Sequence, residues 1–182
     1  NTSSIGSINF SSLRGVAYNG EFFALGETDN KNIYIWKGIP GLNDEPDYII
    51  QNPVGVGRID MNDEWLVVSA YPGAGSPVHV INLTNLDSGI MLPVPGNDDF
   101  PQGVSINEKG FFIALQGSNK VVGWSSVQDA LNGSSPTMSF GGTTNKTNSG
   151  TKMASTVHWD GFHLWVGEFK FSNRLLGFAP SK

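Results

Sequence analysis

Hydrophobic and polar residues alternate in short runs along most of the chain, and tight turns separate the runs. The clearest case is GVAYNGEFFALGE, which begins at Gly15; an alternating run leads into Asn19-Gly20, and an apolar run follows. Alternation with a period of two is typical of a strand with one buried face, and Asn-Gly supplies the positive φ angles of a hairpin turn. The segment therefore predicts an antiparallel hairpin.

The same pattern recurs along the chain. Its counterparts are RIDMNDEWLVVSA from Arg58, GVSINEKGFFIALQG from Gly103 and TVHWDGFHLWVGE from Thr156. A third apolar run follows each hairpin, and a fourth run follows in every unit except the last. Four-stranded units that recur at roughly 40 to 50 residues are the sequence signature of β-propeller blades.

We therefore expect an all-β fold: one domain that is a β-propeller of four four-stranded blades. The last unit lacks a fourth run, whereas SINFSS at residues 7–12 precedes the first unit and resembles SFGG in the third. We expect this N-terminal strand to complete the last blade and close the ring, which leaves no free sheet edge. The expected blades are residues 13–52, 55–95, 101–142 and 153–182, the last together with residues 5–12.

Two other arrangements keep the same strands. In one, the chain is an arc of a larger propeller and a fragment or subunit of that assembly. In the other, two chains form one eight-bladed ring. An open arc exposes two sheet edges and an apolar flank, so self-association is an expectation of both arrangements.

Composition narrows the class of function. The net charge is −5 and only 15% of residues are charged, which disfavours a nucleic-acid partner and a polybasic membrane surface. The absence of cysteine excludes disulfides, thiol nucleophiles and cysteine-ligated zinc. The apolar runs are far shorter than the roughly 20 residues of a membrane-spanning helix, so we expect no membrane span.

Several Asn-X-Ser/Thr sequons occur in the chain. Together with the low charge and the abundance of Gly, Ser, Thr and Asn, they favour an extracellular or cell-surface glycoprotein. The candidate glycosylation sites are Asn9, Asn82, Asn132 and Asn145, and a further sequon begins at Asn1.

One stretch, NKNIYIWKGIPGLNDEPDYIIQNP at residues 30–53, resembles the repeat of NHL-type propellers. The matching pieces are Asn30, Asn32, Ile35-Trp36, Ile39-Pro40, Glu45-Pro46-Asp47 and Gln51. The third-strand part recurs at residues 119–124 and 173–178, whereas the second unit has prolines and glycines in place of the Asn pair. The resemblance implies a propeller fold. NHL-type propellers include binding scaffolds, surface proteins and a few enzymes, so it does not transfer a function.

The segment HWDGFHLWVGE, residues 158–168, looks most like an active site. We expect His158 to lie directly across from His163 on a hairpin whose turn is Asp160-Gly161. Cross-strand histidines can share a metal ion, but a good site needs a third ligand and none is nearby. We therefore expect a structural hairpin and no metal, and we expect His79 to point outward from its own strand. No residue set resembles a nucleophile with a base and an orienting acid.

A binding site is expected on the loop face formed by the second-to-third-strand loops and the links between blades. Its acidic character suits a cationic ligand or calcium, and its aromatic residues suit a protein or glycan partner. The alternative is that Glu27 and Glu168 brace their own loops. The ligand-face candidates are Glu27, Asp29, Tyr71, Asp98, Asp99, Glu168 and Phe169. The candidates that face the central channel are Arg58, Asp60, Ser105 and His158.

These observations favour a non-enzymatic binding or structural module without a cofactor. The alternative is a propeller hydrolase or lyase with a metal ion in the central channel, held near Arg58, Asp60 and His158.

Overall fold

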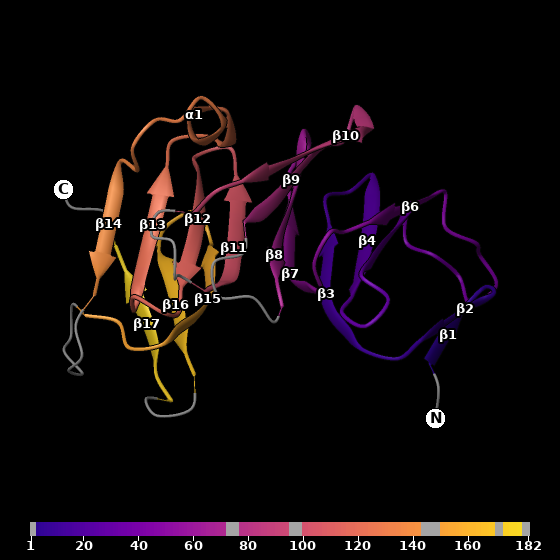
Figure 1. Cartoon of the computed structure of the whole chain (residues 1–182), viewed down its shortest axis with the longest axis horizontal. Helices are drawn as coiled ribbons and strands as arrows, with labels where there is room; N and C mark the ends of the chain where they lie inside the picture. Colours follow the sequence, from indigo (N-terminus) through magenta and orange to yellow (C-terminus); the bar gives the residue numbers. More distant parts are fainter. Residues whose placement is uncertain (1–2, 72–76, 95–99, 143–149, 170–172, 180–182) are drawn as a thin grey trace.

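A computed structural model describes residues 3–71, 77–94, 100–142, 150–169 and 173–179 (Figure 1). This part of the chain is nearly all strand, and the strands form four small antiparallel sheets and a separate two-stranded pair. The four sheets are arranged as the four blades of a β-propeller, so the predicted fold class is confirmed.

The strands follow the repeats. The first blade holds β3 (Leu13–Tyr18), β4 (Phe22–Glu27), β5 (Asn32–Lys37) and β6 (Tyr48–Gln51). The second holds β7 (Val56–Met61), β8 (Trp65–Ala70), β9 (Val78–Asn82) and β10 (Asn85–Leu92). The third holds β11 (Pro101–Asn107), β12 (Gly110–Leu115), β13 (Lys120–Trp124) and β14 (Met138–Gly141), with the helix α1 (Val127–Leu131) before β14. The fourth holds β15 (Ala154–Trp159), β16 (Leu164–Glu168) and β17 (Leu175–Phe178).

An Asn or Asp side chain closes the first hairpin of three blades. Asn19 Oδ1 accepts the backbone N–H groups of Glu21 and Phe22 at 3.0 and 2.8 Å. Asn62 and Asp160 accept the corresponding pairs in the second and fourth blades. A short polar side chain can satisfy turn donors in this way, so these residues specify the hairpins.

The same turn chemistry corrects one predicted register. The Asp160 N–H donates to the His163 carbonyl oxygen at 3.2 Å, so Asp160 precedes the loop instead of lying in it. His158 therefore pairs with Trp165. The prediction that His158 lies directly across from His163 is wrong.

Successive blades pack face to face through apolar side chains. Between the first and second blades, the buried cluster includes Ala24, Ile33 and Ile35 from one sheet and Ile59 and Leu66 from the other. Similar clusters join the second blade to the third and the third to the fourth. Burial of apolar surface at these three interfaces is the main force that holds the sheets together.

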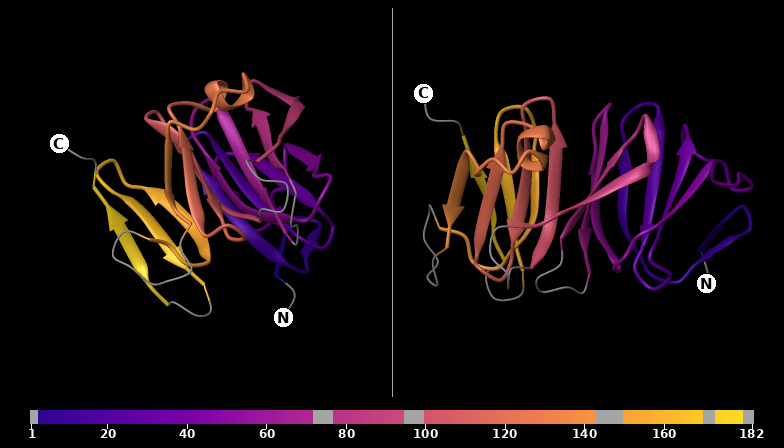
Figure 2. Two further views of the ribbon diagram at one scale, coloured as in Figure 1. Left: turned by 60° about the vertical axis from the view of Figure 1, so that its left-hand side comes forward. Right: turned by 45° about the horizontal axis from the view of Figure 1, so that its top comes forward.

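The innermost strands are in contact in the order β3, β7, β11 and β15. Figure 2 shows the first and fourth blades at opposite ends of this row. Among the described residues, β3 and β15 share no extensive contact like those that join the neighbouring blades.

The N-terminal segment does not complete the last blade, which corrects the predicted ring closure. β1 (Ser3–Ile5) pairs with β2 (Ile8–Phe10), and this hairpin lies on the first blade. Phe10 is buried against Tyr34 and Trp36 there. The apolar side chains of SINFSS thus find a partner close in sequence, at a lower entropic cost than closure over the whole chain.

Candidate functional site

Glu27, a predicted ligand-face residue, is fully buried at the end of β4. Its carboxylate accepts hydrogen bonds from the Ser11 N–H and the Ser11 hydroxyl, both at 2.8 Å. It also accepts hydrogen bonds from Asn30 Nδ2 at 3.1 Å and from the Tyr34 hydroxyl at 3.2 Å. Burial acts to raise the pKa of Glu27, but the hydrogen bonds outweigh it and the pKa is lowered.

Glu168 is the counterpart of Glu27 in the fourth blade. Its carboxylate forms an ion pair with Arg174, 2.7 Å from the guanidinium, and accepts the Lys152 N–H. Ser11 and Lys152 both lie in the segment that leads into the first strand of their blade. The two glutamates therefore brace equivalent connections, which matches the alternative interpretation of this pair.

The other described ligand-face candidates, Asp29, Tyr71 and Phe169, are not buried as Glu27 is. Asp29 is exposed and accepts the Ser11 hydroxyl at 3.1 Å. The Arg14 guanidinium lies 3.5 Å from the centre of the Tyr71 ring, in a cation–π contact. Phe169 is exposed. Asp98 and Asp99 lie outside the described residues.

Three of the four channel candidates, Arg58, Asp60 and His158, line a cavity of about 230 Å³ to which all four innermost strands contribute. Asp60 is a brace between blades, because its carboxylate accepts the Ile106 N–H of the next blade at 2.9 Å. Burial raises the pKa of Asp60, and the hydrogen bonds only partly oppose this.

Ser105 and Arg58 also form hydrogen bonds, whereas His158 is exposed. Ser105, which is buried, accepts the Trp159 N–H at 3.3 Å and also bonds to Asp60. Arg58 donates to the Arg14 carbonyl oxygen at 3.2 Å and forms no ion pair with Asp60. His158 is exposed to the channel. Within the described residues, no group of three or more histidine, aspartate or glutamate side chains is placed to hold a metal ion.

His79 is buried, so the prediction that it points outward is wrong. Its Nδ1 lies 2.7 Å from Asn52 Oδ1, and Asn52 Nδ2 donates to the Val54 carbonyl oxygen at 2.7 Å. Asn52 Oδ1 is thus an acceptor, which makes His79 Nδ1 the donor. Burial lowers the pKa of His79. The alternating pattern around His79 misled because apolar residues of the neighbouring blades cover both faces of this strand.

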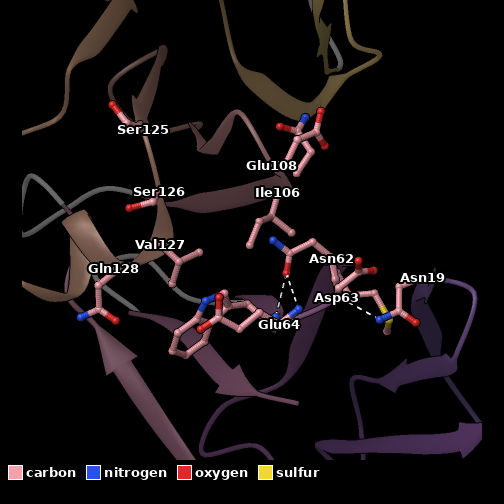
Figure 3. Close-up of a pocket in the computed structure, with 13 residues that line it drawn as sticks. Asn19, Asn62, Asp63, Glu64, Ile106, Glu108, Ser125, Ser126, Val127 and Gln128 are labelled. Atoms are coloured by element: carbon pink, nitrogen blue, oxygen red, sulfur yellow. Dashed lines mark hydrogen bonds between the residues drawn. The ribbon is translucent and has the colours of Figure 1, made fainter. Parts of the chain in front are cut away.

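A groove with a volume of about 560 Å³ lies at the hairpin-turn end of the second and third blades (Figure 3). Asp63, Glu64 and Trp65 come from the first hairpin of the second blade, and Glu108 comes from that of the third. Gln128 of α1 lines the other side. The Asn19 amide donates to the Asn62 carbonyl oxygen at 2.8 Å and joins the first blade to the rim.

The composition of this groove suits recognition of a polar or cationic group. It combines three acidic side chains with an indole and amides, and none of the described residues that line it is Lys or Arg. Its volume falls within the range of small-ligand pockets, roughly 300 to 1,000 Å³. Sequence reasoning missed it by favouring the opposite loop face. The available signal was the clustering of acidic residues at the turns of two consecutive repeats.

The comparisons with known proteins support the fold alone. No protein-family model and no curated protein sequence matches the chain. The computationally designed protein Ika4 matches at a TM-score of 0.63 and 10% identity, over 100% of this chain and 99% of Ika4.

Two natural proteins give similar matches. The Cps50 (Swd1) β-propeller domain of Myceliophteria thermophila matches at a TM-score of 0.62 and 10% identity, over 89% of this chain and 52% of that one. A chain of the nidogen/laminin complex matches at 0.66 and 12% identity, over 94% of this chain and 65% of that one. The chain therefore spans about half of the first domain and under two thirds of the second chain.

The described helix, α1, has five residues. In the described part of the chain no helix has the length and apolar character needed to cross a membrane.

Proposed function

We propose that the chain is a non-enzymatic binding module whose four blades hold the groove between the second and third hairpins in a fixed shape. The observation that carries the proposal is the lining of that groove. Asp63, Glu64 and Glu108 surround it together with Trp65, and no cation of its own neutralises them within the lining. The ligand that fits this chemistry is a cationic segment of a protein partner.

The contacts of three buried or bonded carboxylates support a binding role over an enzymatic one. Glu27, Glu168 and Asp60 have the burial or the contacts that catalytic carboxylates often show. Glu27 and Glu168 each accept a backbone N–H of the segment that enters their blade, and Asp60 accepts one from the innermost strand of the next blade. The proposed alternative, a hydrolase or lyase with a metal ion in the channel, would have to use Asp60 and His158 at the 230 Å³ cavity.

We place this module outside the cell or on its surface. The sequons at Asn9 and Asn132 lie at exposed positions, and Asn82 is partly exposed, so all three are open to glycosylation. Asn145 lies outside the described residues. Occupancy of these sites in protein from its native source would support the location.

The proposal includes an NHL-type origin of the repeats. Trp124 is the last residue of the third strand of its blade and Trp36 the last but one of its own. Each indole N–H donates to a carbonyl oxygen in the following loop, at 3.1 Å for Trp36 and 2.8 Å for Trp124. Lys31, Asn119 and Asn173 share a left-handed backbone directly before or near the start of that strand. These shared details extend the sequence resemblance.

The experiment measures, by isothermal titration calorimetry, how tightly a hexalysine peptide binds the wild type and a groove variant. The double variant Glu64→Gln, Glu108→Gln removes two carboxylates, and we expect roughly twofold to thirtyfold weaker binding, because each exposed charge pair contributes about 0.2–1 kcal/mol. Affinity should also fall as salt is added.

The matched control is Glu21→Gln with Asp87→Asn. It makes the same change of net charge at exposed carboxylates that do not line the groove. Equal weakening in both double variants would show non-specific attraction to an acidic protein and would contradict the proposal. Binding of neutral oligosaccharides with no dependence on these carboxylates would favour a glycan partner.

A further inference from the structure

The fourth blade is one strand short. In the described residues its sheet holds β15, β16 and β17, whereas each of the other blades has a fourth, outer strand. The outer edge of β17 therefore has no strand beside it within the described chain. A free strand edge is a template for pairing with another strand.

The N-terminal segment enters the first blade as a link from a preceding blade would. In each blade, the residue that follows the second strand donates its N–H to the carbonyl oxygen of the residue that directly precedes the first strand. The four donor–acceptor pairs are Thr28 and Ser12 at 3.0 Å, Tyr71 and Gly55 at 2.7 Å, Gln116 and Phe100 at 2.8 Å, and Phe169 and Met153 at 3.1 Å. Ser12 thus takes the place that inter-blade links occupy elsewhere.

β2 also packs like the outer strand of a preceding blade. Phe140, in the outer strand of the third blade, contacts Phe178 on the third strand of the fourth blade, with ring centres 4.5 Å apart. Phe10 of β2 contacts Tyr34 on the third strand of the first blade, with ring centres 5.5 Å apart in an edge-to-face arrangement. The described residues therefore include an outer strand without its inner three at one end, and three strands without an outer one at the other.

The two end flanks expose residues whose counterparts are buried. Val16 and Tyr18 of β3 are 60% and 47% exposed. Their counterparts in the second and third blades, which a preceding blade covers, are at most 7% exposed: Ile59, Met61, Val104 and Ile106. Leu175 of β17 is 68% exposed, whereas its counterparts Ile33, Val78 and Val121 are fully buried.

A hydrogen bond between the innermost strands of successive blades recurs along the row and is missing beyond the fourth blade of the described chain. Asp60 accepts the Ile106 N–H of the next blade, and Ser105 accepts the Trp159 N–H of the next. His158 holds the equivalent position of the fourth blade, where no following blade is present in the described chain.

We propose that two copies of the chain assemble head to tail into a closed ring of eight blades, four from each copy. β2 of one copy takes the place of the outer strand beside β17 of the other, and β3 packs against the flank that carries Leu175. A second copy fits both flanks, because each new interface repeats the packing of the three blade interfaces inside the chain. The proposal is independent of the groove and its ligand.

The test measures native mass by light scattering after gel filtration, over about a hundredfold range of concentration. We expect about 39 kDa, twice the 19.5 kDa of one chain. Val16→Glu and Leu175→Arg place charges on opposite flanks, and each should convert the dimer to the monomer. Phe162→Glu is the control: Phe162 is 74% exposed on the hairpin turn, away from both flanks, and this variant should stay dimeric.

Each variant should still fold, because Val16 and Leu175 are exposed in the single chain. Thermal unfolding of each variant checks this. Loss of the dimer in both flank variants supports the head-to-tail ring. A monomer at every concentration would overturn the proposal, and so would larger open assemblies. A dimer that only Leu175→Arg disrupts would indicate pairing of two fourth blades and would also overturn it.

Discussion

Replacing Glu27 by glutamine tests whether this buried carboxylate stabilises the fold by fixing the segment that enters the first blade. Four hydrogen bonds reach this carboxylate, two of them from Ser11. Glutamine keeps one oxygen but loses the charge, and it turns an N–H₂ group toward Asn30 and Tyr34. Hydrogen bonds to a charged group contribute about 1.5–3 kcal/mol and neutral ones about 0.5–1.5. Each of the two Ser11 bonds weakens by about 1–1.5 kcal/mol and loss of the Asn30 bond costs about 1.5–3 kcal/mol, so the replacement should cost roughly 3.5–6 kcal/mol in all.

The assay is urea unfolding of the wild type and Glu27→Gln, followed by tryptophan fluorescence at several pH values. The pKa of Glu27 is lowered in the fold, so its stabilisation is present above the ordinary glutamate pKa and is lost as pH falls through the lowered value. The difference between the two proteins should be full at neutral pH and shrink in acid.

Glu45→Gln is the matched control. Glu45 also bonds to the N–H and hydroxyl of one serine, Ser7, at 2.6 and 2.8 Å, but it is exposed. Its replacement should cost less than about 1 kcal/mol. Equal costs for the two variants, or a Glu27 difference that grows as pH falls, would show that the buried carboxylate does not stabilise the fold through these hydrogen bonds.

Three further predictions concern packing and titration. Phe10→Ala should lower stability by about 3 kcal/mol and speed hydrogen exchange in residues 3–10, because it removes the ring that holds the N-terminal hairpin on Tyr34; unchanged exchange would contradict that docking. Gly89→Ala should cost about 1–3 kcal/mol in urea unfolding, because an added Cβ would overlap His79 Nε2. The pKa of His79 is lowered in the fold, so the wild type should lose stability as pH falls below about 6.5, the ordinary histidine pKa. His79→Gln should remove that part of the loss. If the stabilities of the two proteins fell in parallel with pH, the imidazole would not be buried in its neutral form.

Local chemistry predicted the strands and the blades. Asn19 and Asn62 mark hairpins because their side chains can satisfy turn donors, and the period-two pattern marks the strands between them. The register around Asp160 could not be obtained in the same way. A turn residue can lie before the loop or within it, and the choice depends on which backbone groups it accepts.

Long-range placement was harder to predict. SINFSS has the pattern of an outer strand, but the pattern does not say which flank it covers; Phe10 packs on Tyr34 of the first blade instead of on the fourth. His79 looked exposed because polar residues usually are, yet Asn52 from another blade supplies the partner that makes its burial tolerable. For the site, Glu27 and Glu168 were found from the repeat. The groove needs two turns and a helix brought together, which no single segment encodes.

The central functional claim is that the propeller binds ligands at the groove between its second and third hairpins. The most direct measurement is a map of backbone amide chemical shifts during titration with hexalysine peptide. The largest changes should cluster at Asn62, Glu64, Glu108 and Gln128. Changes clustered instead around Asp29 and Tyr71 on the opposite loop face, or no localised changes at all, would contradict this claim.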